Sequence, residues 1–216
     1  MPQKTTVGRV VLTSFFVDLL DVIVNLVVML LTGSVVMVAE LAQGGSDLIA
    51  SGFLLIGLKR PQQEIYIWTV ASALMMLLVA SLLSIYFGWK RFLAPEPIEN
   101  ILIAYIALGI SFISNVYAFT LSARRILRSG QSFRQLFAAF NSSSLIMTKN
   151  TFVLDLMGAS AAFVGLIALI LYQLLGEFRF DGLGAVAIGV VLALLSFHLL
   201  WDIKHMAGKT VVKGEL

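Results

Sequence analysis

The stretch SVVMVAELAQGGSDLIASGFLLIGL, residues 34–58, decides the fold class. A tight turn at Thr32–Ser34 precedes it, and a charged stop at Lys59–Pro61 follows it. Between these breaks the chain is mostly apolar. It is also long enough to cross the hydrocarbon core of a bilayer, which is ~30 Å thick and takes ~20 residues of helix. We therefore interpret residues 34–58 as a membrane-spanning helix.

Five further apolar runs of similar length flank this stretch, at residues 9–32, 64–89, 98–123, 150–175 and 182–204. Hydrophobic residues make up 59% of the chain and charged residues 12%, against about 45–50% and about 25% in ordinary globular proteins. A soluble fold of this size cannot bury that many apolar side chains. The predicted fold class is all-α integral membrane, a six-transmembrane-helix bundle over residues 1–208. We expect a short cytoplasmic tail at 209–216 and no C-terminal soluble domain.

The charge balance predicts the orientation of the bundle. The chain carries 15 Lys and Arg against 12 Asp and Glu, a net charge of +3. Basic loops stay on the cytoplasmic side of a membrane, so we interpret the surplus as an orientation signal and not as a nucleic-acid-binding surface. With the N-terminus in the cytoplasm, only Lys90, Arg91 and Arg179 fall outside. We expect both termini to be cytoplasmic, the lipid bilayer to be a partner, no nucleic-acid partner, and a location in the bacterial inner membrane.

Two connections between the spans carry local signals. The segment 124–149 is Arg-rich. Large apolar residues recur in it at helical spacing, namely Phe133, Leu136, Phe137 and Phe140. This pattern is typical of a short amphipathic helix on the inner leaflet; alternatively, the segment only extends the neighbouring spans. On the other side, Asp181 precedes the last apolar run, and we expect it to cap that helix.

Polar residues recur at helical spacing inside the predicted spans. A spacing of i, i+3 and i+7 places three residues on one face of a helix. Ionisable groups in a span are costly, and by default they mark an ion pathway. The residues are Asp18, Asp21 and Asn25 in the first span, Glu40, Gln43 and Asp47 in the second, and a lone Asp155 in the fifth.

The deepest of these acids predict a cation site. Asp47 and Asp155 lie so far inside that each carboxylate needs a proton or a cation. Carboxylate and carbonyl oxygens from two helices form a divalent-cation site, and protons compete with metal for the same oxygens. Asp18 could instead stay hydrated near the cytoplasmic end. Asn115, in the fourth span, could simply form an interhelical hydrogen bond.

Small residues are dense in the second and fifth spans, at Gly44–Ser46 and Gly158–Ala162. Such surfaces let helix backbones approach closely. We therefore expect these two spans to pack together and Asp47 and Asp155 to share one site.

The inner end of the last span carries His198, Asp202 and His205 at i, i+4 and i+7. The two histidines are the only ones in the chain. The spacing suits metal ligands on one face and predicts a secondary metal site. The alternative is that they are interfacial residues reaching toward cytoplasmic water.

Four segments of the chain resemble the cation diffusion facilitators, a family of six-helix divalent metal/proton antiporters. Ala39–Asp47 (AELAQGGSD) is similar to their second helix, and Arg91–Ile98 (RFLAPEPI) to the segment after the third. Ser160–Gly165 (SAAFVG) resembles their fifth helix, and Phe180–Gly189 (FDGLGAVAIG) the start of the sixth. The resemblance covers most of the chain in the correct order, and it implies a homodimer.

The resemblance also implies four ligand positions, which fall here on Gln43, Asp47, Asp155 and Ala159. Gln43 offers a neutral carbonyl oxygen, and Ala159 offers no ligand. Glu40, Asp18, Asp21 or Asn25 could supply the missing one. Zinc is the usual ion of the family, but it favours nitrogen and sulfur ligands, and the chain has no cysteine. Carboxylates, an amide oxygen and water suit magnesium, manganese or ferrous iron better.

The leading hypothesis is a divalent metal cation transporter that exports metal in exchange for protons by alternating access. Asp47 and Asp155 would lose protons, bind the ion and release it when protons return on the other side. We expect no tightly bound cofactor, and Zn, Mn, Fe and Mg all stay open as the transported ion. The alternative is a transport-inactive family member that acts as a membrane scaffold or accessory subunit. No nucleophile–base pair or phosphate loop is recognisable, so we expect no enzyme.

Overall fold

A computed structural model of the chain describes residues 7–57, 62–127, 132–142 and 146–213. All regular structure in these residues is helical, as predicted. The elements in chain order are α1 (Val7–Thr32), α2 (Val35–Gly57), α3 (Gln62–Met75), the π-helix η1 (Met76–Ser81), α4 (Leu82–Leu93), α5 (Ile101–Ile126), the 3₁₀ helix η2 (Phe133–Gln135), α6 (Leu136–Ser142), α7 (Ile146–Leu175) and α8 (Arg179–Lys213). Because α3, η1 and α4 follow one another without a break, they form one long rod.

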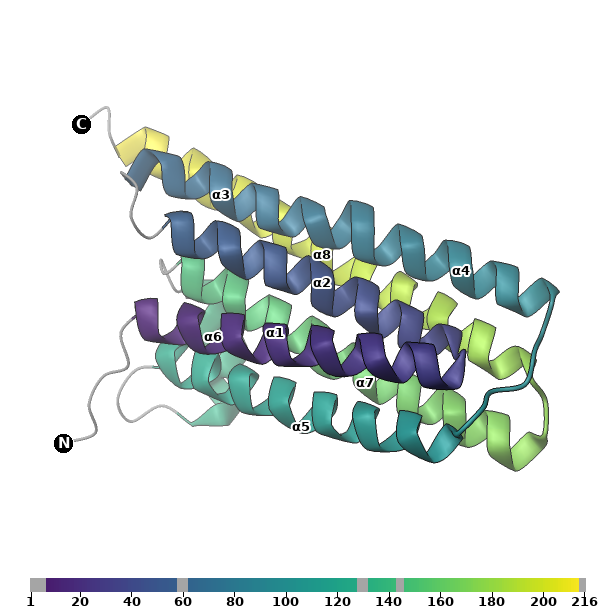
Figure 1. The fold of residues 1–216 in the computed structure, drawn as a ribbon. Coiled ribbons are helices and arrows are strands. Elements are labelled where there is room, and N and C mark those ends of the chain that lie inside the picture. Colours follow the sequence, from purple (N-terminus) through teal and green to yellow (C-terminus); the bar gives the residue numbers. More distant parts are fainter. Residues whose placement is uncertain (1–6, 58–61, 128–131, 143–145, 214–216) are drawn as a thin grey trace.

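The long helices lie side by side in an elongated bundle (Figure 1). The start of α1 and the end of α8 lie at the same end of this bundle, together with α6. The α1–α2 turn, the connection from α4 to α5 and the α7–α8 turn lie at the opposite end. This arrangement agrees with the expectation that both termini are on one side of the membrane, while the identity of that side stays a prediction.

Five helical segments in the described part of the chain are long and apolar enough to cross a membrane. They are Phe15–Thr32, Ile67–Leu93, Ile101–Ile126, Lys149–Leu175 and Arg179–His205. Large apolar side chains face outward on these helices, for example Leu30, which is 72% exposed. The chain is therefore an integral membrane helical bundle.

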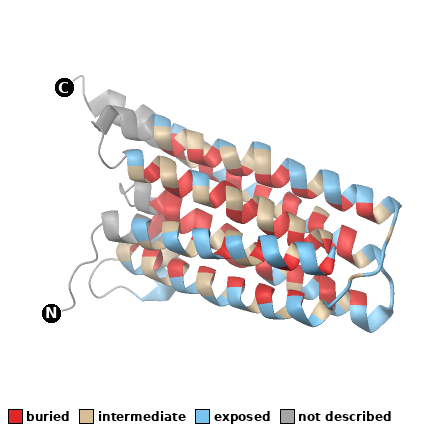
Figure 2. Cartoon of the chain, in the orientation of Figure 1, coloured by how far each residue is buried: buried red, intermediate tan, exposed pale blue. Residues whose placement is uncertain are grey.

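Helix α2 is not one of these five segments, because its polar residues lower its hydropathy. It contacts α1, α3, α4, α7 and α8 and so lies inside the bundle, where buried residues gather (Figure 2). A helix surrounded by protein needs less apolar surface than one that faces lipid. A sixth span formed by α2 stays a prediction.

Most predicted helix limits differ from the structure by a few residues, and the end of α8 differs by more. Helix α5 starts at Ile101 and not at residue 98, because the chain after Pro95–Pro97 stays irregular until Asn100, whose φ is 46°. Helix α8 continues to Lys213, well beyond the predicted end at 204. Its 35 residues rise about 52 Å at 1.5 Å per residue. This is longer than a hydrocarbon core of ~30 Å, so part of α8 extends past the bilayer.

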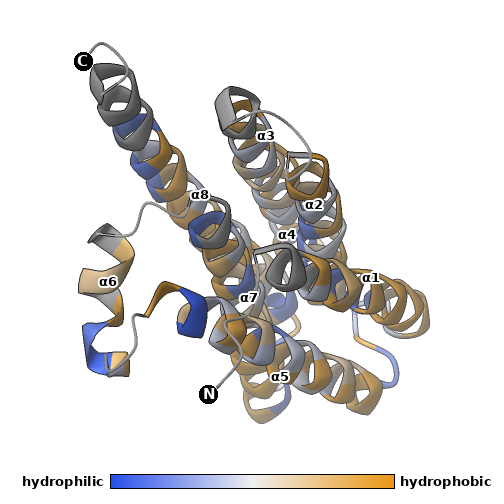
Figure 3. Cartoon of the chain, turned by 90° about the vertical axis from the view of Figure 1, so that its left-hand side faces the viewer, coloured by the Kyte–Doolittle hydropathy of each residue, from blue (hydrophilic) through white to orange (hydrophobic). Residues whose placement is uncertain are grey.

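The segment 124–149 combines parts of the two alternatives, while a position on the inner leaflet stays a prediction. Helices α5 and α7 each extend into it. The short helix α6 comes between them in the chain and lies beside the main bundle (Figure 3). Phe140 of α6 is buried against Phe152 of α7, with ring centroids 5.3 Å apart. Phe133 is exposed, and the side chain of Phe137 lies outside the described residues.

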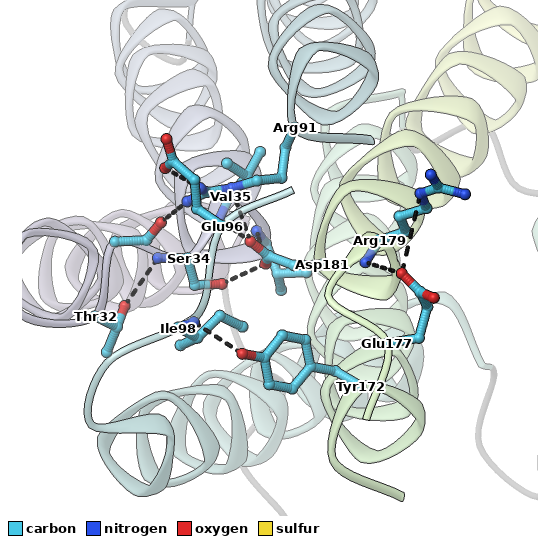
Figure 4. A network of polar contacts seen from close by, with 12 residues as sticks. Thr32, Ser34, Val35, Arg91, Glu96, Ile98, Tyr172, Glu177, Arg179 and Asp181 are labelled. Atoms are coloured by element: carbon cyan, nitrogen blue, oxygen red, sulfur yellow. Dashed lines mark hydrogen bonds and ion pairs between the residues drawn. The ribbon is translucent and has the colours of Figure 1, made fainter. Parts of the chain in front are cut away.

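The expectation that Asp181 caps its own helix is wrong, because its carboxylate caps α2 instead. Asp181 lies in the first turn of α8 and is fully buried. It accepts hydrogen bonds from the Ser34 hydroxyl at 2.6 Å, the Val35 amide at 2.9 Å and the Val36 amide at 3.0 Å (Figure 4). These amides are the free donors of the first turn of α2. One buried carboxylate thus joins the starts of α2 and α8.

Arg91 completes this connection at the same end of the bundle. Its Nε lies 3.3 Å from Asp181, and its guanidinium also donates to Glu96 and to the Gly33 carbonyl (Figure 4). Gly33 has a φ of 64°, a left-handed conformation that suits glycine and ends α1. The α1–α2 turn, α4 and α8 are therefore held together by one buried cation and one buried anion.

Glycines bring α4 and α8 into backbone contact. A Cβ atom placed on Gly88 of α4 would lie 2.7 Å from the Gly182 carbonyl oxygen of α8. One placed on Gly182 would lie 2.6 Å from the Phe92 amide nitrogen, and one on Gly189 would lie 2.7 Å from the Ser81 carbonyl oxygen. No side chain fits at these three positions, so the two helices meet with no side-chain layer between them.

Candidate metal-binding site

Helix α1 is polar inside and apolar outside. Asp18, Asp21 and Asn25 are all buried, as the spacing predicted. Residues between them on the opposite face are exposed, among them Leu20 and Ile23, each 54% exposed. The helix thus presents leucine and isoleucine to lipid and carboxylates to its protein neighbours.

Helix α2 runs antiparallel to α1 and presents its own polar stripe to the interior. Glu40, Gln43 and Asp47 are buried, and so is Ser46. Gly44 allows the close approach of the two helices, because its Cβ position lies 3.3 Å from a carboxylate oxygen of Asp21. The small residue at 44 therefore packs against α1, and not against the fifth predicted span.

One group of polar side chains lies nearest the end of the bundle with the termini. It consists of three acids and one amide, Asp18, Asp47, Asp155 and Gln43, and we call it the inner cluster. Gln43 donates a hydrogen bond to Asp47. The Ser51 hydroxyl donates to Asp18 at 2.5 Å, and the Ser122 hydroxyl donates to Asp155 at 2.6 Å.

The members of the inner cluster also act on one another electrostatically. Asp47 is repelled by both Asp18 and Asp155, and α2 contacts α7. Asp47 and Asp155 thus lie within electrostatic range of each other, as the prediction of a shared site requires. That they bind one ion together stays a prediction.

A second group, the outer cluster, lies further along the same helices and consists of Asp21, Asn25, Glu40 and Ser111. The Ser111 hydroxyl of α5 lies 3.3 Å from Glu40 Oε2 and donates to it. Asp21 is in hydrogen-bond contact with the same serine and repels Glu40. Ser111 and Ser122 were not predicted, although Ser111, Asn115 and Ser122 recur at i, i+4 and i+11, a spacing that also places residues on one helix face.

Several buried oxygen atoms in these clusters have no hydrogen-bond partner among the described residues. They belong to Asn25, Glu40, Gln43 and Asp47, and the hydroxyl of the neighbouring Ser46 also lacks a partner. Buried oxygens that lack a donor are costly, and carboxylates among them need a proton or a cation. The interior of α1 and α2 is thus an incompletely satisfied, oxygen-lined region, which is the chemistry that hard cations prefer.

The described residues do not form a complete set of metal ligands. Within the described ranges, no group of three or more His, Cys, Asp or Glu side chains is close enough to hold one metal ion. Ala159, the fourth position implied by the resemblance, is buried and carries no ligand. A cation in the inner cluster would need oxygens of Gln43, a serine hydroxyl or water in addition to two carboxylates.

The predicted secondary metal site at the end of α8 stays a prediction. His198 and His205 are both exposed, and Asp202 pairs with Lys149 of α7 at 2.7 Å. His205 stacks against Trp201 and bonds to its carbonyl oxygen at 3.0 Å. These contacts agree with the alternative that the histidines are interfacial residues.

Asn115 holds α5 against α7. Its amide donates to the Ser111 carbonyl at 2.9 Å, and its side chain occupies the space that a Cβ on Gly158 would need. The interhelical role of Asn115 is thus a matter of packing against Gly158, and its hydrogen bonds stay within α5.

Membrane-crossing helices around a buried acidic interior define an integral membrane protein with a polar core. The family model of the cation efflux transmembrane domain matches residues 11–204, and the chain therefore belongs to this family.

Three relatives are the mitochondrial proton-coupled zinc antiporters SLC30A9 of Mus musculus, Homo sapiens and Xenopus laevis. The chain is 25%, 24% and 25% identical to them, respectively, over 94% of its own length. The match covers 38%, 38% and 39% of these relatives, so the chain spans about two fifths of the proteins it matches.

Proposed function

We propose that the chain carries divalent cations across a membrane and exports them from the cytoplasm in exchange for protons. The observation that carries this proposal is the inner cluster, in which Asp47 is buried with an unpartnered oxygen and is repelled by Asp18 and Asp155. Membership of the cation efflux family and the names of the relatives support the same activity.

The proposed cycle follows from what a buried carboxylate tolerates. Asp47, whose Oδ1 has no partner among the described residues, cannot stay charged in a dry interior beside a second carboxylate. A divalent cation neutralises them from one side, and protons neutralise them from the other. Rocking of the bundle between these two states would couple metal export to proton uptake without a bound cofactor.

We further propose that the ligands favour hard cations. Apart from Asp18, Asp47 and Asp155, the inner cluster offers only an amide and hydroxyl oxygens. Such sites suit Mn²⁺, Fe²⁺ or Mg²⁺ better than Zn²⁺. Zinc is the ion named for the relatives, and the experiment below therefore tests it beside Mn²⁺.

The proposal includes an orientation and an assembly state, namely cytoplasmic termini and a homodimer in the bilayer. Because the chain has no cysteine, single cysteines test the orientation without background. In intact cells, an impermeant maleimide should label Glu99→Cys in the exposed α4–α5 connection, but should not label the exposed Arg134→Cys in η2. The reverse pattern would invert the topology. Chemical cross-linking in proteoliposomes tests the homodimer.

Transport is measured in proteoliposomes that enclose a metal-sensitive and a pH-sensitive dye. The wild-type chain should move Mn²⁺ or Zn²⁺ together with an opposite proton flux. Asp47→Asn and Asp155→Asn should each abolish both signals. Glu177→Gln, which changes an exposed carboxylate in the α7–α8 turn, is the matched control and should keep both. Undiminished metal flux in both aspartate variants would contradict the proposal.

A second candidate function is a transport-inactive scaffold or accessory subunit. Two observations favour it: Ala159 provides no ligand, and no cluster of three metal-ligating side chains exists in the described part of the chain. This function predicts no saturable metal binding and no flux in the wild-type chain. Isothermal titration calorimetry with Mn²⁺ and Zn²⁺ in detergent distinguishes it from transport.

A further inference from the structure

The outer cluster has more oxygen acceptors than donors. The Ser111 hydroxyl has one proton to donate, and two carboxylates contact it: Glu40 at 3.3 Å and Asp21. The second oxygen of Glu40 has no hydrogen-bond partner among the described residues, although the side chain is completely buried. Even with the Asn25 amide beside Asp21, the donors in this cluster leave Oε1 of Glu40 without a partner.

Asn25 is the independent sign that something else belongs in this place. Its side chain is 0% exposed, its amide nitrogen contacts the Asp21 carboxylate, and its amide oxygen has no hydrogen-bond donor in the part of the chain that the structure describes. A buried amide normally makes several hydrogen bonds. Asn25 lies on the same face of α1 as Asp21 and beside it.

The register of the two helices places Asn25 across from Glu40. Helix α1 runs antiparallel to α2, with Gly44 packed against Asp21. One turn along α1 from Asp21 leads to residue 25, and one turn back along α2 from Gly44 leads to residue 40. Residues 25 and 40 therefore lie opposite each other. An amide oxygen, two carboxylates and a hydroxyl thus converge from α1, α2 and α5.

The outer cluster is the neighbour of the inner cluster on α1 and α2, and the acids of the two lie within electrostatic range of each other. Glu40 and Asp47 lie on one helix seven residues apart, which corresponds to about 10 Å along the axis. In the described residues, the inner cluster takes Asp155 from α7, whereas the members of the outer cluster come from α1, α2 and α5. On the α7 side, Gly158 and the side chain of Asn115 fill the space beside Ser111.

We propose that the outer cluster is a second divalent-cation station, with ligand oxygens from Asp21, Asn25, Glu40 and Ser111. The proposal rests on the transport function given above and adds a stop on the path of the ion beyond Asp47. Its ligands are all oxygens, and only two of them are charged groups, so it takes a hard ion such as Mn²⁺ or Mg²⁺ and keeps water in the remaining positions. The station also accounts for the unpartnered amide oxygen of Asn25, because a bound cation takes that oxygen as a ligand.

The test counts Mn²⁺ sites on the purified full chain in detergent, with free Mn²⁺ measured by electron paramagnetic resonance. The wild-type chain should bind two ions. Glu40→Gln and Asn25→Leu should each bind one, and Asp47→Asn should bind one at the other site. Asn25→Leu is nearly isosteric and leaves the charge unchanged. The ion that each variant keeps shows that the variant is folded. Glu177→Gln is the control for a carboxylate change and should bind two.

The outcomes show whether the second station fails alone or together with the proposed function. If the wild-type chain binds one ion, and Asp47→Asn loses it while Glu40→Gln and Asn25→Leu keep it, the second station is excluded and the transport site remains. If Glu40→Gln and Asn25→Leu still bind two ions, the second station is also excluded. If the wild-type chain binds no Mn²⁺ and no Zn²⁺, both proposals fail together.

Discussion

Lys149 of α7 and Asp202 of α8 form an ion pair with a distance of 2.7 Å between Nζ and Oδ2. The ammonium is 1% exposed and lies 4.4 Å from the ring centroid of Phe140 in α6. By the charge count alone, Lys149 would be one more basic residue on the cytoplasmic side. In the structure it is an interior cation that joins α6, α7 and α8 near the end with the termini.

Removal of one partner should destabilise this joint. Lys149→Met leaves the Asp202 carboxylate without its cation, and breaking a buried pair costs about 3–5 kcal/mol. Because the Asp202 side chain is 24% exposed, water compensates in part, and we expect a loss of about 2 kcal/mol. Denaturant unfolding in detergent measures it. The double variant Lys149→Met/Asp202→Leu should lose less than the sum of the two single variants; strict additivity would show that the pair contributes nothing.

Asp181→Ala should lower stability more than any other single carboxylate change at that end of the bundle. The substitution removes the acceptor of three hydrogen bonds to α2 and leaves the buried Arg91 with one partner fewer. Loss of a helix cap costs about 1 kcal/mol, and loss of charged hydrogen bonds brings the expected total to about 3 kcal/mol. Thermal unfolding is the measurement, with the exposed Glu177→Ala as control. Equal midpoints for the two variants would contradict the prediction.

Gly158→Ala should be destabilising, although alanine is the better helix former. The added Cβ occupies the position of the Asn115 amide, which would have to move. We expect a loss of about 1–3 kcal/mol and partial recovery in Gly158→Ala/Asn115→Ala. Gly52→Ala, at which the added atom meets nothing within 4 Å, should be neutral or stabilising by up to about 1 kcal/mol. Thermal unfolding of the four proteins in parallel tests this packing, and equal effects at 158 and 52 would refute it.

Gln43→His should shift ion preference toward zinc. An imidazole at this position can still donate to Asp47, and it offers the nitrogen ligand that zinc favours. We expect the ratio of Zn²⁺ to Mn²⁺ flux to rise about tenfold, which corresponds to about 1.4 kcal/mol. Competition between the two ions in proteoliposomes measures the ratio. Gln43→Leu serves as control, because it should lower both fluxes; an unchanged ratio in Gln43→His would place residue 43 outside the ion path.

The sequence predicts the helices and the polar stripes well, because both depend on local spacing. The spacing of Asp18, Asp21 and Asn25 places them on one face, and the cost of burying polar groups against lipid turns that face inward. The same argument holds for Glu40, Gln43 and Asp47. It holds for Ser111, Asn115 and Ser122 as well, where the signal was present but weaker, since serine is common on helices of any kind.

Partners across helices could not be predicted in the same way. Asp181 precedes an apolar run and so fits the local rule for a cap, yet the free amides that it reaches belong to α2, 145 residues away. Asp202 fits a metal-ligand spacing with two histidines, yet the tertiary fold gives it Lys149. In both cases a strong charge pairs with the nearest complementary group in space, and that group depends on the packing of α7 and α8.

The contact of Gly88 with Gly182 has a mechanical consequence. At this contact the backbone of one helix leaves no room for even a methyl group on the other, so there is no long side chain that could change rotamer to let the helices slide. We therefore expect α4 and α8 to tilt together as one stiff unit. Any sliding that the proposed transport cycle needs would then fall to other interfaces of α8, such as that with α7, where the side chains of Ser196 and Met157 meet at 4.0 Å.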